Sequence, residues 1–343
     1  MTTLTTKFAR LMGASLLVSS FGLGAALAQE VVLKLHQMLP AQAPVPSLVL
    51  QPWMDKITAE SGGRIVFEHF PAMQLGGKPP ELVDQVKDGV ADVIWTLPGY
   101  TPGRFPRTEV IELPFLANDA ESASRALYQL GEKYMFDTEY ADYKMLAMFT
   151  HGPGNFHSSK PILAPADLAG VKLRAPTRVT NMMVTSLGAT AVGMPVPAVP
   201  ESLSKGVIDA TMLPWEVTGG LKVAELVKNH TEFTGKALYV GAFIIAMNKD
   251  KYNSLPDDLK AVIDANSGLE FSALAGKTSQ EADAKARQIA VDLGNSIVTL
   301  DAAQSAVWEE AAKPTYDAWL AETAAAGFDG QAILDDTKAL LGQ

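Results

Sequence analysis

Apolar and polar positions change their spacing in a regular order between residues 167 and 216. Short apolar runs at 171–174, 190–194 and 207–212 have the length of buried strands. The segments between these runs carry apolar residues at helical spacing, and prolines and glycines separate the segments. This succession of strand, helix, strand, helix and strand predicts a parallel sheet.

The N-terminal part of the chain repeats this pattern. Apolar runs at 31–35, 64–70 and 91–95 predict strands, and helices are expected at 47–61 and from Pro79 onward. The match is one of pattern only, because no segment of the sequence recurs. A chain of this length can form two such units, so an α/β fold with two lobes is expected.

The second half of the chain adds strands and a long helical segment. A strand is predicted at 145–150, and the residues up to 157 are expected to form a loop between the lobes. The apolar run at 239–247 fits a buried strand that returns to the first lobe. Residues 256–294 favour a helix almost without interruption, whereas 296–300 predict a strand, and two more helices close the chain.

The first 28 residues have the layout of a secretory signal peptide. Lys7 and Arg10 precede the short apolar run 11–23, and Ala26-Leu27-Ala28 forms a cleavage site of the small-x-small type. Cleavage before Gln29 and export are therefore expected. The alternative is a membrane anchor, but the run is too short and too rich in glycine and serine to span a bilayer comfortably.

Charge and cysteine content exclude several classes of function. The chain has no cysteine, which excludes disulfides, thiolate catalysis and cysteine-bound metals. Removal of the signal leaves 26 basic and 38 acidic residues, a net charge of −12. Such a charge disfavours nucleic acid and anionic membrane surfaces as partners. Any site for an anion must therefore be a local basic feature.

Arg174 stands at the end of a predicted strand. Ligands of parallel sheets lie beyond the carboxyl ends of the strands, and a guanidinium can hold a carboxylate through two parallel hydrogen bonds. Trp215 and Glu216 follow the strand predicted at 207–212 and occupy a similar place. The sequence thus indicates a site for a carboxylate at this edge of the sheet.

Three segments carry a family resemblance. DLAGVKLRAP (167–176), LGATAVGMP (187–195) and SLSKGVIDAT (202–211) occur in this order and at spacings similar to those in the solute-binding proteins of tripartite ATP-independent periplasmic (TRAP) transporters, the DctP-like family. The resemblance implies an α/β, two-lobed periplasmic binding protein fold with parallel-rich sheets, a ligand cleft between the lobes and a long helix that spans both. It also implies a non-enzymatic, periplasmic protein that captures a small organic acid and delivers it by hinge closure to TRAP permease subunits.

The pattern and the resemblance together suggest a division of the chain. Residues 1–28 would be the signal peptide, and 29–150 with about 239–250 would form lobe I. Residues 151–238 would form lobe II, and 251–343 would supply the lobe-spanning helix, the C-terminal helices and one strand. We expect no cofactor, no metal and no direct insertion into a membrane, and the oligomeric state stays open.

The resemblance also suggests roles for individual residues. Arg174 would pair with the carboxylate of the ligand, and Asn155 would contact a hydroxyl or keto oxygen. Many members have Asn-Pro where this chain has Leu213-Pro214. Trp215 follows in this chain, and its ring would form a wall of the ligand site. Glu216 has three open interpretations: it accepts from a ligand hydroxyl or amine, holds a cation that bridges to the carboxylate, or stabilises a helix N-terminus.

The remaining candidates concern the shape and charge of the ligand. A dicarboxylate would need a second cation at the site, which Arg104 or Arg178 would have to supply. If neither arginine lies at the site, the best interpretation is a monocarboxylate that is aromatic or carries a 2-oxo or 2-hydroxy group. A C4-dicarboxylate or a sugar acid is the alternative. The other residues expected at the ligand, all near strand ends, are Trp95, Tyr100, Phe243, Gln37 and Met194.

An enzyme of the periplasm, a hydrolase or a lyase, is the alternative from a different class. The sequence has no HExxH motif, and the mature part has no GxSxG motif. His151 and His157 lie six residues apart in a predicted loop, which is poor spacing for zinc. A binding protein is therefore the favoured interpretation.

Overall fold

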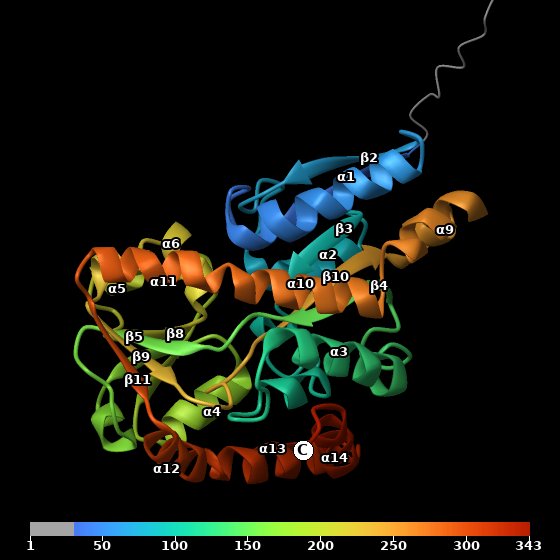
Figure 1. Cartoon of the computed structure of the whole chain (residues 1–343). Coiled ribbons are helices and arrows are strands. Elements are labelled where there is room, and N and C mark those ends of the chain that lie inside the picture. Colours follow the sequence, from blue (N-terminus) through green and yellow to red (C-terminus); the bar gives the residue numbers. More distant parts are fainter. Residues whose placement is uncertain (1–30) are drawn as a thin grey trace, which may run out of the picture.

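Two β-sheets lie side by side, each flanked by helices, in the computed structural model, which describes residues 31–343 (Figure 1). The predicted signal segment and its cleavage site before Gln29 lie outside these residues. The first sheet has the strand order β2-β1-β3-β10-β4, and the second has the order β11-β9-β5-β8-β6-β7. We call the two sheets, each with its covering helices, lobe I and lobe II.

Lobe I contains the N-terminal strands and one strand from far along the chain. Its parallel core β2-β1-β3 comes from the predicted strand-helix-strand pattern. The strands are β1 (Val31–Gln37), β2 (Ile65–Phe70), β3 (Val93–Thr96), β4 (Tyr143–Thr150) and β10 (Ala242–Asn248). The helical segments are η1 (Val45–Leu50), α1 (Gln51–Glu60), η2 (Pro79–Glu81), α2 (Leu82–Lys87), η3 (Pro98–Tyr100), η4 (Thr108–Glu112), α3 (Ala120–Leu130), η5 (Gly131–Met135) and α8 (Lys249–Asn253).

Lobe II contains the segment that carries the family resemblance. Strand β6 lies between β7 and β8 and runs parallel to both. The strands are β5 (Asn155–Ser158), β6 (Lys172–Ala175), β7 (Thr190–Gly193), β8 (Ala210–Leu213), β9 (Asn229–Phe233) and β11 (Ser296–Leu300). The helical segments are η6 (Pro165–Leu168), α4 (Arg178–Ser186), η7 (Val196–Ala198), α5 (Val199–Ser204), α6 (Trp215–Gly220), α7 (Val223–Leu226), α11 (Asp283–Asp292) and α12 (Ala302–Ala312).

The chain crosses between the lobes along two neighbouring segments. Strand β4 of lobe I continues into β5 of lobe II, and β9 of lobe II continues into β10 of lobe I. On arrival, β5 and β10 each run antiparallel to their neighbours. The crossing segments are joined by main-chain hydrogen bonds, such as the 2.9 Å bond from the Gly154 N–H to the Tyr239 carbonyl. Two paired connections of this kind form a hinge between the lobes.

Two expectations about local structure are wrong. Residues 155–157 were expected in a loop but lie in β5, because pairing with β8 and β9 satisfies a backbone that has little strand pattern of its own. The expected helix at 256–294 is interrupted. It consists of α9 (Asp257–Ala265), α10 (Leu269–Glu281) and α11, because Gly268 adopts a left-handed φ of 92° and donates its N–H to the Leu146 carbonyl.

A helical path across both lobes is nevertheless present. Helices α10 and α11 are separated only by Ala282, whose backbone stays in the helical region. Helix α10 packs on α3 and β4 of lobe I, and α11 packs on α6 of lobe II. Figure 1 shows them as one orange path that passes over both sheets. This path is the third connection between the lobes.

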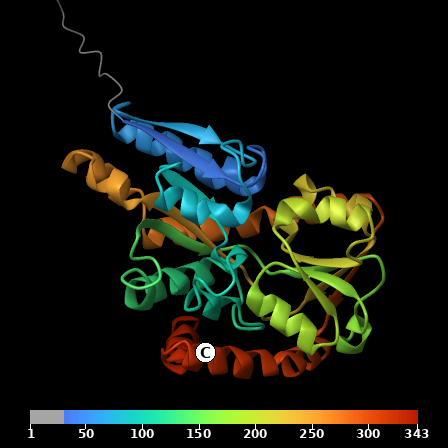
Figure 2. The same cartoon turned by 180° about the vertical axis from the view of Figure 1, so that it is seen from behind.

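The C-terminal helices brace the opposite side of the molecule. Helix α13 (Pro314–Ala325) follows α12 and packs on α4 of lobe II, whereas α14 (Gly330–Leu340) packs on α3 of lobe I (Figure 2). Trp308 and Trp319 are fully buried. The chain end therefore contacts both lobes.

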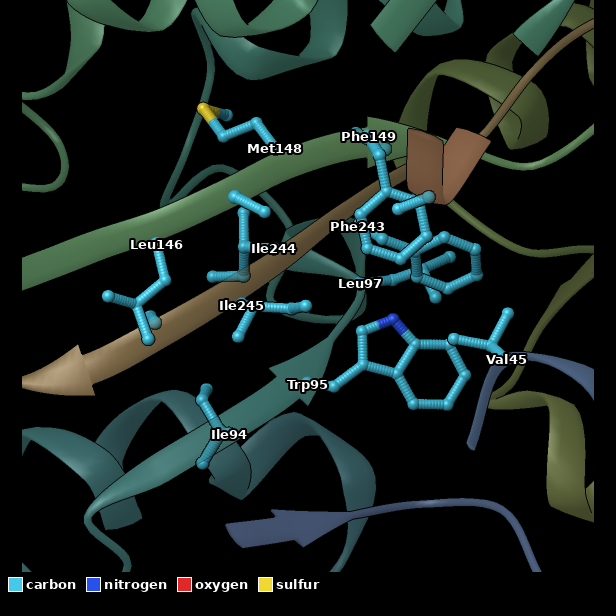
Figure 3. Close-up of a cluster of buried hydrophobic side chains, with 14 of the residues drawn as sticks. Val45, Ile94, Trp95, Leu97, Leu146, Met148, Phe149, Phe243, Ile244 and Ile245 are labelled. Atoms are coloured by element: carbon cyan, nitrogen blue, oxygen red, sulfur yellow. The ribbon is translucent and has the colours of Figure 1, made fainter. Parts of the chain in front are cut away.

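The core of lobe I surrounds β10 (Figure 3). Strand β10 is buried along its whole length between β3 and β4. The Phe243 ring lies 4.9 Å from the Trp95 ring and 5.2 Å from the Phe149 ring, measured between centroids. The aromatic cluster at the end of β10 thus joins the core of lobe I to the hinge.

A substitution in the hinge should test this packing. A Cβ atom on Gly154 would lie 1.9 Å from Cε1 of Tyr239, so Gly154→Ala should lower the free energy of unfolding by about 1–3 kcal/mol in urea titrations. Gly220→Ala is the matched control, because a Cβ there meets nothing within 4 Å and alanine favours the helix. Equal urea midpoints for the two variants would contradict this prediction.

Candidate functional site

A cavity lies where the hinge and the two lobes meet, and the space between its lining atoms measures about 370 Å³ when the part open to solvent is counted. Its walls come from loops of lobe I, from the crossing segments and from the strand ends of lobe II. The residues that line it are Met38, Leu39, Trp95, Leu97, Tyr100, His151, Arg174, Pro176, Val196, Leu213, Pro214, Glu216, Val217, Tyr239 and Phe243. Most of them are apolar or aromatic, which is typical of a site for a small organic ligand.

Arg174 is the cation of this cavity. It is the third residue of β6, the middle strand of three, and its side chain is almost fully buried. Its Nε and Nη2 atoms donate to the Met194 carbonyl at 3.0 and 2.9 Å, and Nη1 donates to the Met212 carbonyl at 3.0 Å. Among the described residues it has no acidic partner within salt-bridge distance. The orientation of the guanidinium is thus fixed by carbonyls, while its charge stays available for an anion.

The local sequence explains how Arg174 reaches this place. Pro176 ends β6, because proline cannot donate to the sheet, and Thr177 then caps α4. The Thr177 N–H donates to Oγ1 of Thr180 at 2.9 Å, which fixes the first turn of α4. The chain therefore turns away from the sheet after Ala175, one residue beyond Arg174, which leaves the space beyond the strand end open.

Tyr100 belongs both to the cavity and to the contact between the lobes. Its ring lines the cavity from η3 of lobe I, and its hydroxyl oxygen accepts a 3.0 Å hydrogen bond from the Val196 N–H of lobe II. Burial raises the pKa of Tyr100, although the charge of Arg174 opposes the rise. Tyr100 is therefore a neutral donor that is in place only while the lobes are closed.

Two buried polar atoms of the cavity wall have no hydrogen-bond partner in the structure. They are Nε1 of Trp95, a donor, and Oε2 of Glu216. A buried polar atom without a partner is unfavourable by roughly 1–3 kcal/mol. Both atoms belong to residues that face the same space, which points to a polar ligand there.

His151 forms part of the hinge in a fixed tautomer. Its Nδ1 lies 2.6 Å from the Gly152 carbonyl and must donate, so Nε2 accepts from the Gly241 N–H at 2.9 Å. Burial lowers the pKa of His151 to about 4. The ring is therefore neutral and joins the two crossing segments.

The structure brings together five of the residues selected from the sequence. Trp95, Tyr100, Arg174, Glu216 and Phe243 all line the cavity. They come from β3, η3 and β10 of lobe I and from β6 and α6 of lobe II, so both lobes contribute.

Four other candidates do not line the cavity. Trp215 packs against His157 and His230 and donates from Nε1 to Glu232 at 2.8 Å; successive helical residues point about 100° apart, so only Glu216 faces the cavity. The other three are engaged in local hydrogen bonds. The Asn155 side chain donates to the Pro153 carbonyl, and the Gln37 side chain bonds to the backbone of Leu39. The main-chain carbonyl of Met194 accepts from Arg174.

Several residues of the cavity wall were not predicted from the sequence as ligand contacts. Leu97 lies in the turn that follows β3, and Tyr239 lies in the second crossing segment. The turn signals after β3 could have pointed to Leu97. Tyr239 had no signal of its own, because only the pairing of the two crossing segments places it against Gly154 and the cavity.

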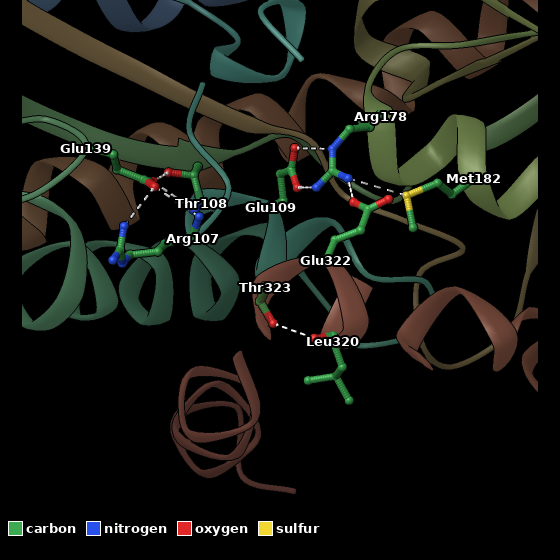
Figure 4. A network of polar contacts seen from close by, with 9 residues as sticks. All are labelled: Arg107, Thr108, Glu109, Glu139, Arg178, Met182, Leu320, Glu322 and Thr323. Atoms are coloured by element: carbon green, nitrogen blue, oxygen red, sulfur yellow. Dashed lines mark hydrogen bonds and ion pairs between the residues drawn. The ribbon is translucent and has the colours of Figure 1, made fainter. Parts of the chain in front are cut away.

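Arg104 and Arg178, the possible partners of a second carboxylate, are engaged elsewhere. Arg178 of lobe II pairs with Glu109 of lobe I and with Glu322 of α13 (Figure 4). Arg104 pairs with Asp84 at 2.7 Å. Burial raises the pKa of Glu109, although Arg178 opposes the rise. The Arg178 cluster therefore connects both lobes and the C-terminal brace outside the cavity.

Comparison with known proteins agrees with this geometry. Residues 36–323 match the model of the DctP family, described as bacterial extracellular solute-binding protein, family 7. The chain belongs to this family, whose members bind solutes and are not enzymes, and it is a TRAP solute-binding protein.

Three solved structures are similar over almost the whole described chain. A TRAP solute-binding protein from Rhodoferax ferrireducens, solved with copurified benzoate, is 47% identical, with a TM-score of 0.89 over 91% of this chain and 98% of that one. A marine metagenome protein specific for aromatic acids, solved with 3-hydroxybenzoate, is 45% identical, with a TM-score of 0.89 over 92% and 99%. A Bordetella bronchiseptica protein with bound mandelate is 31% identical, with a TM-score of 0.84 over 91% and 99%.

The described residues contain no cluster of three or more histidine or acidic side chains that could hold a metal ion. Within the same part of the chain, no helix has both the length and the apolar character that a membrane crossing needs.

The Arg178 cluster generates a prediction about closure. Arg178→Ala would leave Glu109 buried without its cation between the lobes, which should destabilise the closed arrangement by about 1–3 kcal/mol. Calorimetry should show about a tenfold or greater loss of affinity for any acid that the wild-type protein binds. Arg104→Ala, which removes a pair within lobe I, should leave the affinity unchanged; an equal loss in both variants would argue against this role.

Proposed function

We propose that this protein binds an aromatic monocarboxylate between its lobes and delivers it to the membrane subunits of a TRAP transporter. The observation that carries the proposal is the buried guanidinium of Arg174, which has no acidic partner among the described residues and lies in a mainly apolar cavity. A carboxylate supplies the missing negative charge, and an aromatic ring suits the walls.

The roles of the wall residues follow from their chemistry. Arg174 binds the carboxylate, and Nε1 of Trp95 is a second donor within the cavity. Leu97, Tyr239 and Phe243 offer apolar contact to the ring of the ligand. A charge-assisted hydrogen bond contributes about 1.5–3 kcal/mol, so desolvation of the ring must supply much of the affinity.

The charge balance disfavours dicarboxylates. Among the described residues, Arg174 is the only cationic side chain that lines the cavity, and Arg104 and Arg178 are engaged in ion pairs elsewhere. A second carboxylate near Glu216 would meet like charge or an unpaired acid. The similar proteins with bound benzoate, 3-hydroxybenzoate and mandelate also support an aromatic acid.

Capture and release follow from the contacts between the lobes. A ligand that touches Arg174 of lobe II and Trp95 of lobe I favours the closed state, since it contacts both lobes only when they meet. Delivery to a permease is the role of TRAP solute-binding proteins, and the hinge would allow release on reopening.

A substitution series at Arg174 tests the carboxylate contact. Arg174→Ala should weaken benzoate binding by about 1.5–3 kcal/mol or more, and Arg174→Lys should recover only part, because an ammonium cannot form the fork. Calorimetry gives the affinities, and circular dichroism checks that each variant is folded, because two carbonyls lose their donors. Wild-type affinity in either variant would refute the assignment.

A competition series tests the ligand class. Benzoate, 3-hydroxybenzoate and mandelate should bind more tightly than succinate and malate, because the cavity offers one cation and apolar walls. A ligand at 100 times its Kd should stabilise the protein by about 2.7 kcal/mol, which thermal-shift assays detect. Dicarboxylates that bind at least tenfold more tightly would contradict the proposal. Conversion of a bound acid to a product would favour the enzyme alternative.

A further inference from the structure

The carboxyl group of Glu216 is buried in the cavity wall without a counter-ion. Its side chain is 3% exposed, it lines the cavity from α6, and its Oε2 atom has no hydrogen-bond partner. Among the described residues, no lysine, arginine or histidine lies within salt-bridge distance of it. A carboxylate in such a place is strongly disfavoured unless it takes up a proton or finds a donor.

A second carboxyl group lies beside it. The Glu216 N–H donates to Oδ1 of Asp283 at 2.7 Å, which joins α6 to the first residue of α11. The other oxygen of Asp283 faces Gly152, where a Cβ atom would lie only 2.4 Å from it. The negative charge of Asp283 therefore acts on the Glu216 carboxyl group, and two acids so placed in a buried region disfavour simultaneous ionisation.

The other titratable groups around Glu216 do not supply a positive charge to it. Arg174 of β6 donates to carbonyl groups, His151 of the first crossing segment is neutral, and Tyr100 and Tyr239 have pKa values raised by burial. Glu232 of β9, held by Arg287, adds negative charge near Asp283.

These surroundings decide the charge of Glu216 in the closed protein. Burial, and then the charge of Asp283, raise the pKa of Glu216 to about 8, and burial raises the pKa of Asp283 to about 7. When the lobes open, water reaches the wall of the cavity and the pKa of Glu216 should return toward its ordinary value. Closure therefore converts an ionised side chain into a carboxylic acid at neutral pH.

We propose that Glu216 is a specificity-determining residue that binds a hydroxyl group of the aromatic acid in its neutral form, and that closure over the ligand takes up one proton from solvent. This inference rests on the proposed function. A carboxylic acid can donate and accept, so it matches a hydroxyl on the body of the ligand, while Arg174 holds the carboxylate, which stays ionised.

The sign of the pH dependence follows from the raised pKa. Affinity is greatest below the pKa of Glu216 in the open protein, since no proton has to be taken up there. Above that pKa, each pH unit should weaken binding by about tenfold, and the loss should level off above about pH 8, where the closed protein also loses the proton.

The experiment combines calorimetry with a matched set of variants. Benzoate and 3-hydroxybenzoate are titrated into the mature protein between pH 6 and 9, and at pH 7 in buffers of different ionisation enthalpy. Wild-type protein should take up at least one proton and prefer the hydroxylated acid, since burial also raises the pKa of Asp283 and of Glu112. Glu216→Gln should keep this preference, because an amide also donates and accepts, but should take up about one proton fewer than the wild-type protein and show a weaker pH dependence. Glu216→Ala should lose the preference and show the same smaller proton uptake.

Several outcomes would overturn the inference. Binding by the wild-type protein without proton uptake would do so, and so would a hydroxyl preference that survives in Glu216→Ala. Uptake that is undiminished in Glu216→Gln but falls in Glu112→Gln would assign the proton to Glu112, another buried acid with a pKa raised to about 8. Tighter binding on addition of Na⁺ would mean that a cation, and not a proton, neutralises Glu216. If neither acid binds, the proposed function itself fails.

Discussion

The site depends on a positive charge that the fold buries with no acidic partner among residues 31–343. Arg174 lies on the middle strand of three, and the carbonyls of Met194 and Met212, at the ends of the two neighbouring strands, hold its guanidinium. The orientation of the guanidinium is set by the carbonyls of the two neighbouring strands, and hence by the order of the strands, rather than by a flexible salt bridge. A buried charge of this kind is tolerated when an anion completes it, so the most favourable state of the cavity is the occupied one.

The same space exists only when the lobes meet. Tyr100 of lobe I accepts from the Val196 N–H of lobe II. Arg178 joins both lobes to the C-terminal brace. Each of these contacts involves a buried or half-buried polar group, so opening exchanges them for water. Under the proposed function, ligand binding and closure would be coupled through polar contacts as well as through the apolar wall.

Two buried acids, Glu112 and Glu216, are unfavourable for the stability of the closed protein. Glu112 and Glu216 both have pKa values raised to about 8 by burial, and each has an oxygen atom without a partner. Groups of this kind destabilise a closed protein and persist at sites of function. Glu216 lines the cavity, whereas Glu112 does not.

Much of the architecture is determined by local sequence pattern. The strand-helix-strand order of both lobes, the return of the apolar run near residue 240 and the position of Arg174 at a strand end all follow from apolar spacing and from proline and glycine positions. These features were predictable because strand ends in a parallel sheet converge, and Pro176 marks the end of the strand that carries Arg174.

Tertiary structure decided which of the neighbouring candidates face the ligand space. Glu216 faces the cavity while the adjacent Trp215 packs on two histidines, and Arg178 and Arg104 are held by acids from distant segments. The short strand at 155–158 exists because its partners do, and the long helix breaks at Gly268, where lobe I supplies a carbonyl. Such outcomes depend on contacts between residues far apart in the chain, and the local spacing of apolar residues does not determine those contacts.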